Sequence, residues 1–547
     1  MSDSPRLPAR PSLEQLHKQA KDLLRRFRAG DSSAAARLRA ARPSLQDSAT
    51  LADAQFTLAR EYGFETWARL KHFVATPAAP SPAVYRIDGQ ENILSVNGAV
   101  SDEDWDRIAG IMEERGIDGL RANGATDAAL RRLARLERLT RLHLDGSANL
   151  TDDGLGRLSD HPRLADLDLC GKGRITDRGL EVLRLLPELR RIRLCWQPNV
   201  SDAGIAHLTV CDRLEEVDLM GTFTGDGALR ALAGKPALRR FKTGRQVTDA
   251  GLPLLHDFPV FQRWHGGEPR YSLMTFTADP NHLLIDGPFT DAGLATLVGL
   301  DGLFGLSFFW HSPGFTGAGL RPLQQLPHLG FLGCGGAQCG DDAMRQIAEL
   351  PRLRMLMAQG TVAGDGGFAE LSRSRLEYLW GRECPNLTSR GFRALAAMPA
   401  LRGLAVSCKH VDDAALALLP GCPALRELLP MDVPDEGFRH IGRCAQLQDL
   451  WCMYCRDTGD RATEHIAALS LKSYYAGQTR ITDRSLEILS RMESLERLEF
   501  YACSGLTAAG VAHLARLPEL KEVALEGIAG MTGEVAKLFP AAVRVRY

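Results

Sequence analysis

Hydrophobic residues recur along this chain of 547 residues at a fixed spacing of about 25 residues. An apolar marker stands at Val100, Ala125, Leu150, Ile175 and Val200, and it is nearly always followed by Ser or Thr and then Asp. A period of this length is typical of stacked copies of one supersecondary unit. The pattern therefore predicts a repeat array rather than several separate globules.

Each copy of the unit reads L-x-x-L-x-L, then a short loop, then (I/V/L)-(T/S)-D-x-G-L-x-x-L. The last two leucines of the first half alternate with other residues, which predicts a short parallel strand whose intervening side chains line a concave face. Ser or Thr before Asp predicts a helix start, because the hydroxyl can cap free N–H groups and the helix dipole favours the carboxylate. One copy places these positions at Leu139, Leu142, Leu144, Leu150, Thr151, Asp152, Gly154 and Leu155.

These residues resemble the leucine-rich repeat, specifically its cysteine-containing, ribonuclease-inhibitor-like kind. The resemblance covers roughly residues 90–547 and is carried by about eighteen copies. It implies an α/β leucine-rich-repeat solenoid, with a curved parallel sheet inside and helices outside, preceded by a small all-α domain.

One insertion interrupts the array. The markers Val247 and Phe289 are 42 residues apart, which is one repeat and about seventeen further residues. Two apolar runs around a turn at Asp279-Pro-Asn predict a hairpin there. We therefore expect a first arc at 84–264, an insertion with a hairpin at 265–286, and a second arc at 287–547.

The N-terminal part has a different pattern. A helical apolar stripe begins at Leu13, and further helices are expected at about 32–41, 50–62 and 65–74, which makes residues 12–74 a small helical bundle. Residues 1–11 are expected to be disordered, and residues 75–83 to be a Pro/Ala linker.

The segments Ser12–Leu24 and Ala59–Phe64, together with Trp67-Ala-Arg-Leu-Lys, resemble the leader found ahead of ankyrin repeats in bacterial proteins. This resemblance implies a bacterial source and no known chemistry. Residues 1–75 hold 13 Lys and Arg against 8 Asp and Glu, a net charge of +5. This charge is explained by a solvated helix face or, alternatively, by a docking face for an acidic partner.

Charge and hydropathy narrow the choice of partners. The net charge of −1 gives no general attraction to nucleic acid or anionic lipid, so neither is expected as a partner.

No apolar run approaches the roughly eighteen residues of a membrane span, and residues 1–11 carry Pro and charge where a signal peptide needs an apolar core. We expect a cytoplasmic protein or, as an alternative, a secreted effector.

The twelve cysteines match positions of the repeat. Cys384, Cys455 and Cys503 fall three residues after the last strand position, a position that we assign to Asn149 and Asn199 in other copies. Inward strand positions are expected for Cys334 and Cys452, whereas Cys211, Cys422 and Cys444 close helices. The Cys452-x-x-Cys455 pair is therefore interpreted as structural rather than as a redox or zinc motif, and the thiols are expected to be reduced.

The register assigns charged side chains to the concave face of the first arc. Acidic and basic rows alternate there, so they can neutralise each other between strands about 4.8 Å apart. The alternative is recognition of a charged partner. The rows are Asp166 and Asp168, Arg191 and Arg193, Glu216 and Asp218, and Arg240 and Lys242.

The concave face of the second arc changes to aromatic and Met side chains. Such an apolar surface indicates an interaction site, and Trp and Tyr dominate binding hot spots. The alternative is that these residues pack against each other or under the inserted hairpin. The predicted partner-binding residues are Phe309, Met355, Met357, Tyr378, Trp380, Met431, Trp451, Met453, Tyr475 and Tyr501.

Motifs for catalysis, cofactors or metal binding are not found. The sequence holds no His-Glu-x-x-His, no Gly-x-Ser-x-Gly and no Walker-type loop. The sequence thus predicts a non-catalytic scaffold for a protein or peptide partner, with no cofactor and no metal. The alternative is an effector or ubiquitin-ligase-adaptor-like protein that recruits a substrate through the repeats.

Overall fold

The computed structural model describes residues 13–42, 48–61, 66–67, 70–71, 85–96, 98, 100–264, 266–267, 270–273, 281–309, 314–453 and 455–547. The chain divides into two compact units, Met1–Arg86 and Ile87–Tyr547. The predictions for residues 1–11 and 75–83 fall outside the described residues, as does most of the helix expected at 65–74.

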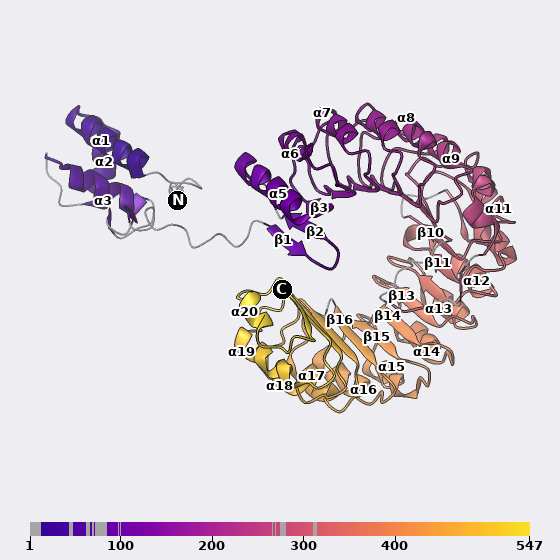
Figure 1. Ribbon diagram of the computed structural model, residues 1–547. Coiled ribbons are helices and arrows are strands. Elements are labelled where there is room, and N and C mark those ends of the chain that lie inside the picture. Colours follow the sequence, from indigo (N-terminus) through magenta and orange to yellow (C-terminus); the bar gives the residue numbers. More distant parts are fainter. Residues whose placement is uncertain are drawn as a thin grey trace. The chain divides into compact units, whose positions relative to one another are not determined.

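The first unit is helical in its described part (Figure 1). Its helices are α1 (Leu13–Arg28), α2 (Ser32–Ala41) and α3 (Leu51–Glu61). The apolar stripe of α1 is buried against the other two helices, with Ala20, Leu38 and Leu58 in the shared core. Asp31 caps α2 by accepting hydrogen bonds from the backbone N–H groups of Ser33 and Ala34. The three predicted helices that these residues cover are thereby confirmed.

The second unit is a curved solenoid built on one sheet of twenty strands. Each strand from β2 onward pairs in parallel with the next strand along the chain, and β1 pairs with β2. The strands are β1 (Tyr85–Asp88), β2 (Ile93–Val96), β3 (Gly119–Ala122), β4 (Arg141–His143), β5 (Asp166–Asp168), β6 (Arg191–Arg193), β7 (Glu216–Asp218), β8 (Arg240–Lys242), β9 (His282–Ile285), β10 (Gly305–Phe308), β11 (Phe331–Gly333), β12 (Met355–Met357), β13 (Tyr378–Gly381), β14 (Gly403–Ser407), β15 (Glu427–Met431), β16 (Asp449–Met453), β17 (Ser473–Gly477), β18 (Arg497–Tyr501), β19 (Glu522–Glu526) and β20 (Arg544–Arg546).

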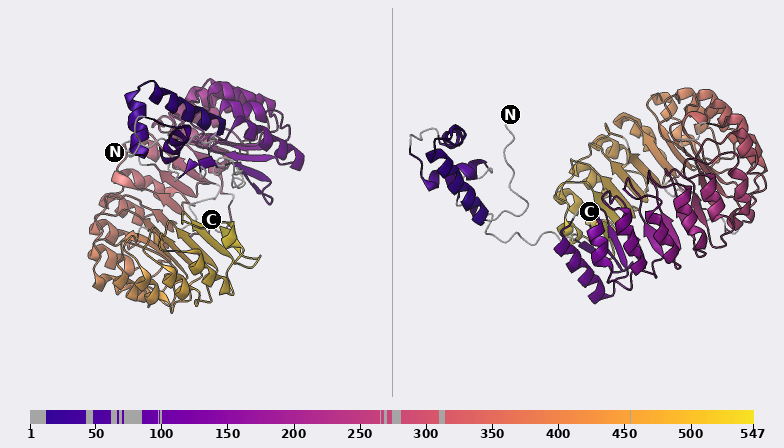
Figure 2. Two further views of the ribbon diagram at one scale, coloured as in Figure 1. Left: turned by 90° about the vertical axis from the view of Figure 1, so that its left-hand side faces the viewer. Right: turned by 90° about the horizontal axis from the view of Figure 1, so that it is seen from above.

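Helices cover the outer side of this sheet, while the strands line its inner, concave side (Figures 1 and 2). The α-helices are α5 (Asp102–Arg115), α6 (Asp127–Leu133), α7 (Asp152–Leu155), α8 (Asp202–Ile205), α9 (Asp226–Leu232), α10 (Pro259–Gln262), α11 (Asp291–Ala295), α12 (Asp341–Ala348), α13 (Asp365–Leu371), α14 (Ser389–Ala396), α15 (Asp413–Leu416), α16 (Phe438–Ile441), α17 (Asp460–Ile466), α18 (Asp483–Leu489), α19 (Ala508–Val511) and α20 (Gly533–Ala536).

Several repeats use a 3₁₀ turn in place of an α-helix, before one or after one. These turns are Gly156–Asp160, Gly179–Leu185, Ala206–Val210, Leu252–Asp257, Gly317–Gln325, Gly336–Gln338, Leu419–Gly421, Asp435–Gly437 and Ala512–Arg516. No described helix is long and apolar enough to cross a membrane.

Leucines of the repeat motif form the core between the sheet and the helices. Leu142, Leu167 and Ile192 occupy matching positions on β4, β5 and β6 and are all fully buried. This register confirms the predicted alternation of inward and concave-facing residues. The second unit is therefore an α/β leucine-rich-repeat solenoid, as the sequence predicts.

The Thr/Ser-Asp pair joins neighbouring repeats in addition to starting a helix. Asp177 accepts two hydrogen bonds from Ser201 of the next repeat, from the backbone N–H at 2.8 Å and from the hydroxyl at 2.5 Å. The Ser201 hydroxyl in turn caps α8 by accepting from the N–H of Ala203. The same pairing of Asp with the next Thr recurs at Asp152, Asp365 and Asp483. This Asp therefore has two roles. Its charge is favourable near the helix dipole, as the sequence predicts, and its carboxylate also hydrogen-bonds the next repeat.

The sheet continues across the insertion. Phe241 of β8 lies opposite Leu283 of β9, and Leu283 lies opposite Leu306 of β10. The two arcs expected from the sequence are consequently parts of one sheet. The hairpin expected in the insertion falls largely outside the described residues, and those described at 270–273 form no strand.

Candidate binding surface

The register brings most of the predicted binding residues together on the concave face of β12 to β17. Met357 lies opposite Trp380, and Trp451 lies opposite Tyr475. Adjacent parallel strands are close enough for these large side chains to pack laterally. We name the resulting cluster the aromatic patch. Its buried members are Leu273, Phe304, Phe331, Met355, Tyr378, Trp380, Ala405, Leu429, Met431 and Trp451, and its partly buried members are Trp264, Tyr271, Met357, Met453 and Tyr475.

Two predicted residues lie outside the aromatic patch. Tyr501 ends β18 next to the patch and keeps 45% of its surface exposed. Phe309 follows β10, and its ring centroid lies 5.8 Å from that of Trp196 in the first arc. The structure therefore assigns Phe309 to a contact between loops rather than to the patch.

Burial differs strongly within the patch. The two tryptophans are almost covered, with 6% of Trp380 and 8% of Trp451 exposed, whereas Met357, Met453 and Tyr475 are half-buried. The accessible apolar surface is thus carried by the second group and by Tyr501, and at the other end of the patch by the partly buried Trp264 and Tyr271. The buried side chains of the patch pack against each other and against Leu273 of the insertion. This arrangement corresponds to the alternative to a binding surface that the sequence left open.

Part of the insertion lies on the patch. Leu273 is fully buried there, and its backbone N–H donates to Glu427 Oε2 over 2.7 Å, while the Ser272 hydroxyl donates to the same oxygen over 3.1 Å. Gly403 of β14 leaves room for the Tyr378 ring and for Leu273, because a Cβ at that position would overlap the Tyr378 ring and lie 3.0 Å from Leu273 Cγ. Burial raises the pKa of the Glu427 carboxyl, although the hydrogen bonds from Leu273 and Ser272 oppose this shift.

Sequence reasoning missed Leu273 and Glu427 as part of this surface. Glu427 stands at a concave-facing strand position on β15, directly opposite Asp449 of β16, and two carboxylates side by side next to aromatic residues are the signal that could have identified it. No local pattern predicts its contact with Leu273, because 154 residues separate the two.

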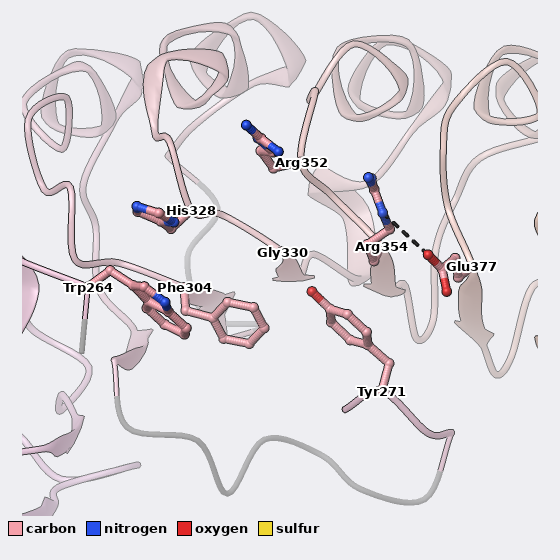
Figure 3. A pocket seen from close by; sticks show the side chains of 8 residues that line it. All are labelled: Trp264, Tyr271, Phe304, His328, Gly330, Arg352, Arg354 and Glu377. Carbon is pink, nitrogen blue, oxygen red and sulfur yellow. Dashed lines mark ion pairs between the residues drawn. The ribbon is translucent and has the colours of Figure 1, made fainter. Parts of the chain in front are cut away.

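A cavity of about 450 Å³, lined in part by members of the aromatic patch, lies at the amino ends of β10 to β13 (Figure 3). We name it the edge cavity. It combines aromatic walls with basic side chains at the rim and is lined by Trp264, Tyr271, Phe304, His328, Gly330, Arg352, Arg354 and Glu377.

The charged rows of the first arc pair laterally, as the register predicts. Arg191 Nη2 lies 2.9 Å from Asp166 Oδ2, and Lys242 Nζ lies 2.6 Å from Asp218 Oδ2. Burial would raise the pKa of Asp166, but a hydrogen bond and charge from His143, together with the charge of Arg191, lower it overall. The concave face of this arc is accordingly self-neutralised, which confirms the interpretation as a paired surface.

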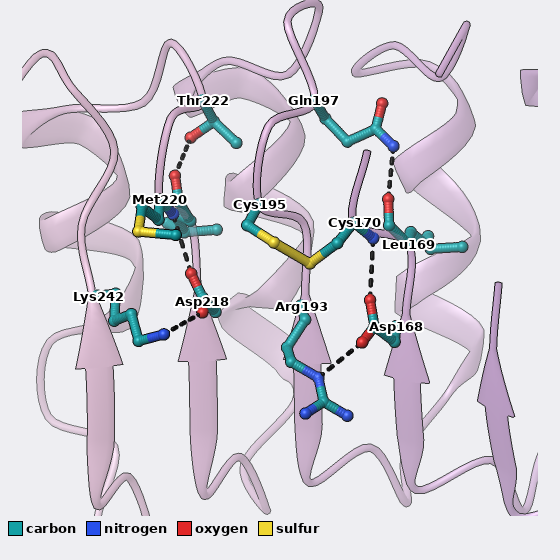
Figure 4. The surroundings of a disulfide bond; sticks show 11 residues. Asp168, Leu169, Cys170, Arg193, Cys195, Gln197, Asp218, Met220, Thr222 and Lys242 are labelled. Carbon is teal, nitrogen blue, oxygen red and sulfur yellow. Dashed lines mark hydrogen bonds and ion pairs between the residues drawn. A yellow bond between two sulfur atoms is a disulfide. The ribbon is translucent and has the colours of Figure 1, made fainter. Parts of the chain in front are cut away.

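Two cysteines of the first arc differ from the expectation of reduced thiols. Cys170 and Cys195 form a disulfide, with their Cα atoms 4.6 Å apart (Figure 4). They occupy equivalent positions after β5 and β6, and the 25 residues between them are one repeat. Neighbouring parallel strands bring such positions within disulfide range.

The other cysteines are buried thiols. Cys455 donates to the carbonyl of Pro430 in the preceding repeat over 3.0 Å, and Cys503 donates to that of Ala476 over 3.3 Å. Burial raises the pKa of Cys455 to about 12, so its thiol is not a nucleophile at neutral pH. Within the described residues, no group of three or more His, Cys, Asp and Glu side chains could hold a metal ion.

The position assigned to Asn149 and Asn199 is corrected by the structure. Both asparagines are exposed, whereas Gln197 is buried and donates through Nε2 to the carbonyl of Leu169 over 2.5 Å. Gln197 lies three residues after Leu194, as Cys455 lies three residues after Cys452. The equivalent of the cysteine position is thus Gln197, and the assignment was two residues too far along the chain.

Comparisons with known proteins complete this description. No protein-family model matches the chain, and no curated protein matches it. Similar solved structures include an internalin from Listeria monocytogenes at 15% identity, with coverage of 78% of this chain and 88% of that chain and a TM-score of 0.25. TLR13 in complex with ssRNA13 matches at 15% identity, with coverage of 76% of this chain and 66% of that chain and a TM-score of 0.43. The yeast complex of Rad7 and Elc1 matches at 12% identity, with coverage of 82% of this chain and 88% of that chain and a TM-score of 0.33.

Proposed function

We propose that this chain is a non-catalytic scaffold that binds a protein or peptide partner on the concave face of the second arc. One observation carries the proposal: apolar side chains remain accessible at the C-terminal end of the aromatic patch. Met453 and Tyr475 are half-buried on β16 and β17, and Tyr501 is largely exposed on β18. Aromatic and Met side chains on a concave surface are favoured at binding interfaces.

The geometry around Gly477 makes this surface continuous. Gly477 lies opposite both Met453 and Tyr501 in the sheet, and it has no side chain to separate them. A Cβ at Gly477 would lie 2.6 Å from Tyr475 Oη, so the absence of one leaves room for the Tyr475 side chain. Met453, Tyr475 and Tyr501 therefore form one accessible apolar strip.

A charged rim borders this strip on β18 to β20. Arg546 lies 2.9 Å from Glu522 and 3.5 Å from Glu499, so the rim charges are largely paired with each other. An apolar centre with a polar rim is the usual anatomy of a protein interface. The arrangement favours a partner that presents apolar side chains in the centre and polar groups at the border.

Affinity capture with the full chain, followed by titration of the captured partner, tests this proposal. We expect Tyr475→Ala and Tyr501→Ala each to weaken binding by about 1 to 2 kcal/mol, as hot-spot aromatics do. The matched control is Tyr547→Ala, because Tyr547 is 56% exposed and lies outside the strip. Unchanged affinity in both strip variants, with normal thermal melts, would refute the proposed face. Capture of ubiquitin machinery would instead favour the adaptor-like alternative.

We extend this proposal to the type of repeat, the source of the protein and its location. Cys455 and Cys503 support the cysteine-containing repeat type, since their thiols bond the preceding repeat. The proposal includes the leader resemblance of residues 12–74 and the bacterial source that this resemblance implies; α1 to α3 are the helices expected there. Ten buried free thiols support a cytoplasmic location, whereas the Cys170–Cys195 disulfide supports the secreted alternative. Thiol counting in denaturant without reductant distinguishes the two states of that pair.

A further inference from the structure

The edge cavity has a shape and a lining that the proposed scaffold function does not use. It lies at the amino ends of β10 to β13, whereas the exposed strip lies on β16 to β18. Its volume of about 450 Å³ falls within the range of small-ligand sites, about 300 to 1,000 Å³.

Three aromatic rings form one side of the cavity (Figure 3). The ring centroid of Phe304 lies 5.2 Å from that of Trp264 and 5.9 Å from that of Tyr271. The Trp264 ring also stacks on His328 at 5.6 Å, with 15° between the ring planes. These separations fix the rings in contact with one another, so they offer a preformed apolar wall to a flat ligand group.

Gly330 lets the Phe304 and Tyr271 rings of this wall pack closely against the start of β11. A Cβ at Gly330 would lie 2.6 Å from Phe304 Cε2 and would overlap the Tyr271 hydroxyl oxygen. A side chain at this position is thus incompatible with the two rings as they stand.

The opposite side of the cavity is basic. Arg354 Nε lies 3.3 Å from Glu377 Oε1, but Glu377 also pairs with Arg402 at 3.2 Å. Arg352 is exposed at the rim and has no acidic partner among the described residues. Arg354 therefore shares its glutamate with a third arginine, and the charge of Arg352 is not paired by a described residue, which leaves positive charge at the cavity.

We propose that the edge cavity binds an aromatic carboxylate. The flat ring packs against Trp264 and Phe304, and the carboxylate is bound by Arg352 and Arg354, whose guanidinium groups suit carboxylates. This chemistry has two sources, a free aromatic acid and a peptide chain that ends in an aromatic residue. Both present the same ring and the same carboxylate to the same walls.

Calorimetric titration of the full chain with N-acetyl-tryptophan tests the proposal. We expect measurable binding of this probe, and at least about tenfold weaker binding of N-acetyl-tryptophan amide, which lacks the carboxylate, and of N-acetyl-alanine, which lacks the ring. A short peptide that ends in a free Trp separates the two sources, since tighter binding than the free probe indicates a chain end and equal or weaker binding indicates a free acid. No heat of binding with the probe at millimolar concentration would overturn the proposal.

Two variants locate the binding in the cavity. Arg352→Gln should weaken the probe at least about fivefold, whereas Arg321→Gln, at an exposed arginine of the Gly317–Gln325 turn outside the cavity, should leave its affinity unchanged. Gly330→Ala should also weaken binding, because the added methyl group enters the space of Tyr271 and Phe304. Equal affinity of Arg352→Gln and Arg321→Gln, in proteins with wild-type melts, would contradict the site. The strip variants Tyr475→Ala and Tyr501→Ala should bind the probe normally, so failure of the two proposals can be distinguished.

Discussion

At the scale of the residue, the Asp and the Gly of the Asp-x-Gly motif fit each other across a repeat boundary. A Cβ at Gly204 would lie 2.5 Å from Asp177 Oδ1 and 2.9 Å from Leu180 Cδ1 of the preceding repeat. The glycine is therefore required for close approach, while the aspartate holds Ser201 of the next repeat. The sequence shows both residues but not their contact, because the partner of each lies one repeat away.

Gly204→Ala tests this fit. The added methyl group must displace the Asp177 carboxylate or Leu180, so we expect the free energy of unfolding to fall by about 1 to 3 kcal/mol. Gly156→Ala is the matched control, because a Cβ there meets nothing within 4 Å and the backbone conformation is helical. Urea denaturation measures both variants. A loss at Gly204 no larger than the change at Gly156 would show that the repeats are not packed as described.

His161 makes stability depend on pH. Burial lowers the pKa of this imidazole below its ordinary value of 6.5, although a hydrogen bond to the carbonyl of Leu136 opposes the shift. Between the lowered pKa and 6.5, the unfolded chain binds a proton that the folded chain does not. The contribution of His161 to stability is therefore present above 6.5 and is lost as the pH falls through the folded pKa.

Unfolding free energies measured at about pH 7.5 and about pH 5.5 test whether His161 lowers the stability on acidification. The wild-type protein should lose more stability on acidification than His161→Asn, by at most about 1.4 kcal/mol, because pH 5.5 lies one unit below the ordinary pKa of 6.5. The comparison concerns the difference between the two pH values, so a constant cost of the substitution cancels. An equal loss in both proteins would mean that His161 titrates alike in the folded and unfolded states.

At the scale of the element, the sequence predicts which residues face the concave side of the sheet, but not which of them are accessible to solvent. The alternation of leucines places Met357, Trp380 and Trp451 on this face, and the strands confirm that placement. Leu273 of the insertion packs into the same cluster, and this segment has no repeat pattern and contacts a strand 154 residues away. A local period carries no information about such a contact.

Glu427 should hold that segment in place. Glu427→Ala removes the acceptor of the Leu273 N–H, so we expect hydrogen exchange at the Leu273 amide to accelerate about tenfold, the equivalent of about 1.4 kcal/mol. Glu427→Gln retains an acceptor oxygen at the same distance along the side chain and should preserve most of the protection. If exchange at Leu273 is unchanged in the alanine variant, the segment is held by its apolar contacts alone.

At the scale of the whole molecule, one sheet connects every repeat of the second unit. The charge-paired face of the first arc and the aromatic face of the second arc therefore belong to one continuous concave surface. The fold class, the repeat register and the change of character between the arcs could be predicted from the sequence, since they follow from local periodicity. The edge cavity could not, because it depends on contacts between the insertion and the repeats. The register places Cys170 and Cys195 side by side, but spacing alone does not tell whether the two thiols are oxidised.

Hydrogen exchange of the full chain, with and without its captured partner, shows whether the partner binds the accessible strip on β16 to β18. We expect slower exchange in the peptides that cover residues 449–501, and no change in those that cover the charge-paired strands at 141–193. Protection confined to α1–α3 or to the outer helices, with residues 449–501 unchanged, would contradict binding at this strip.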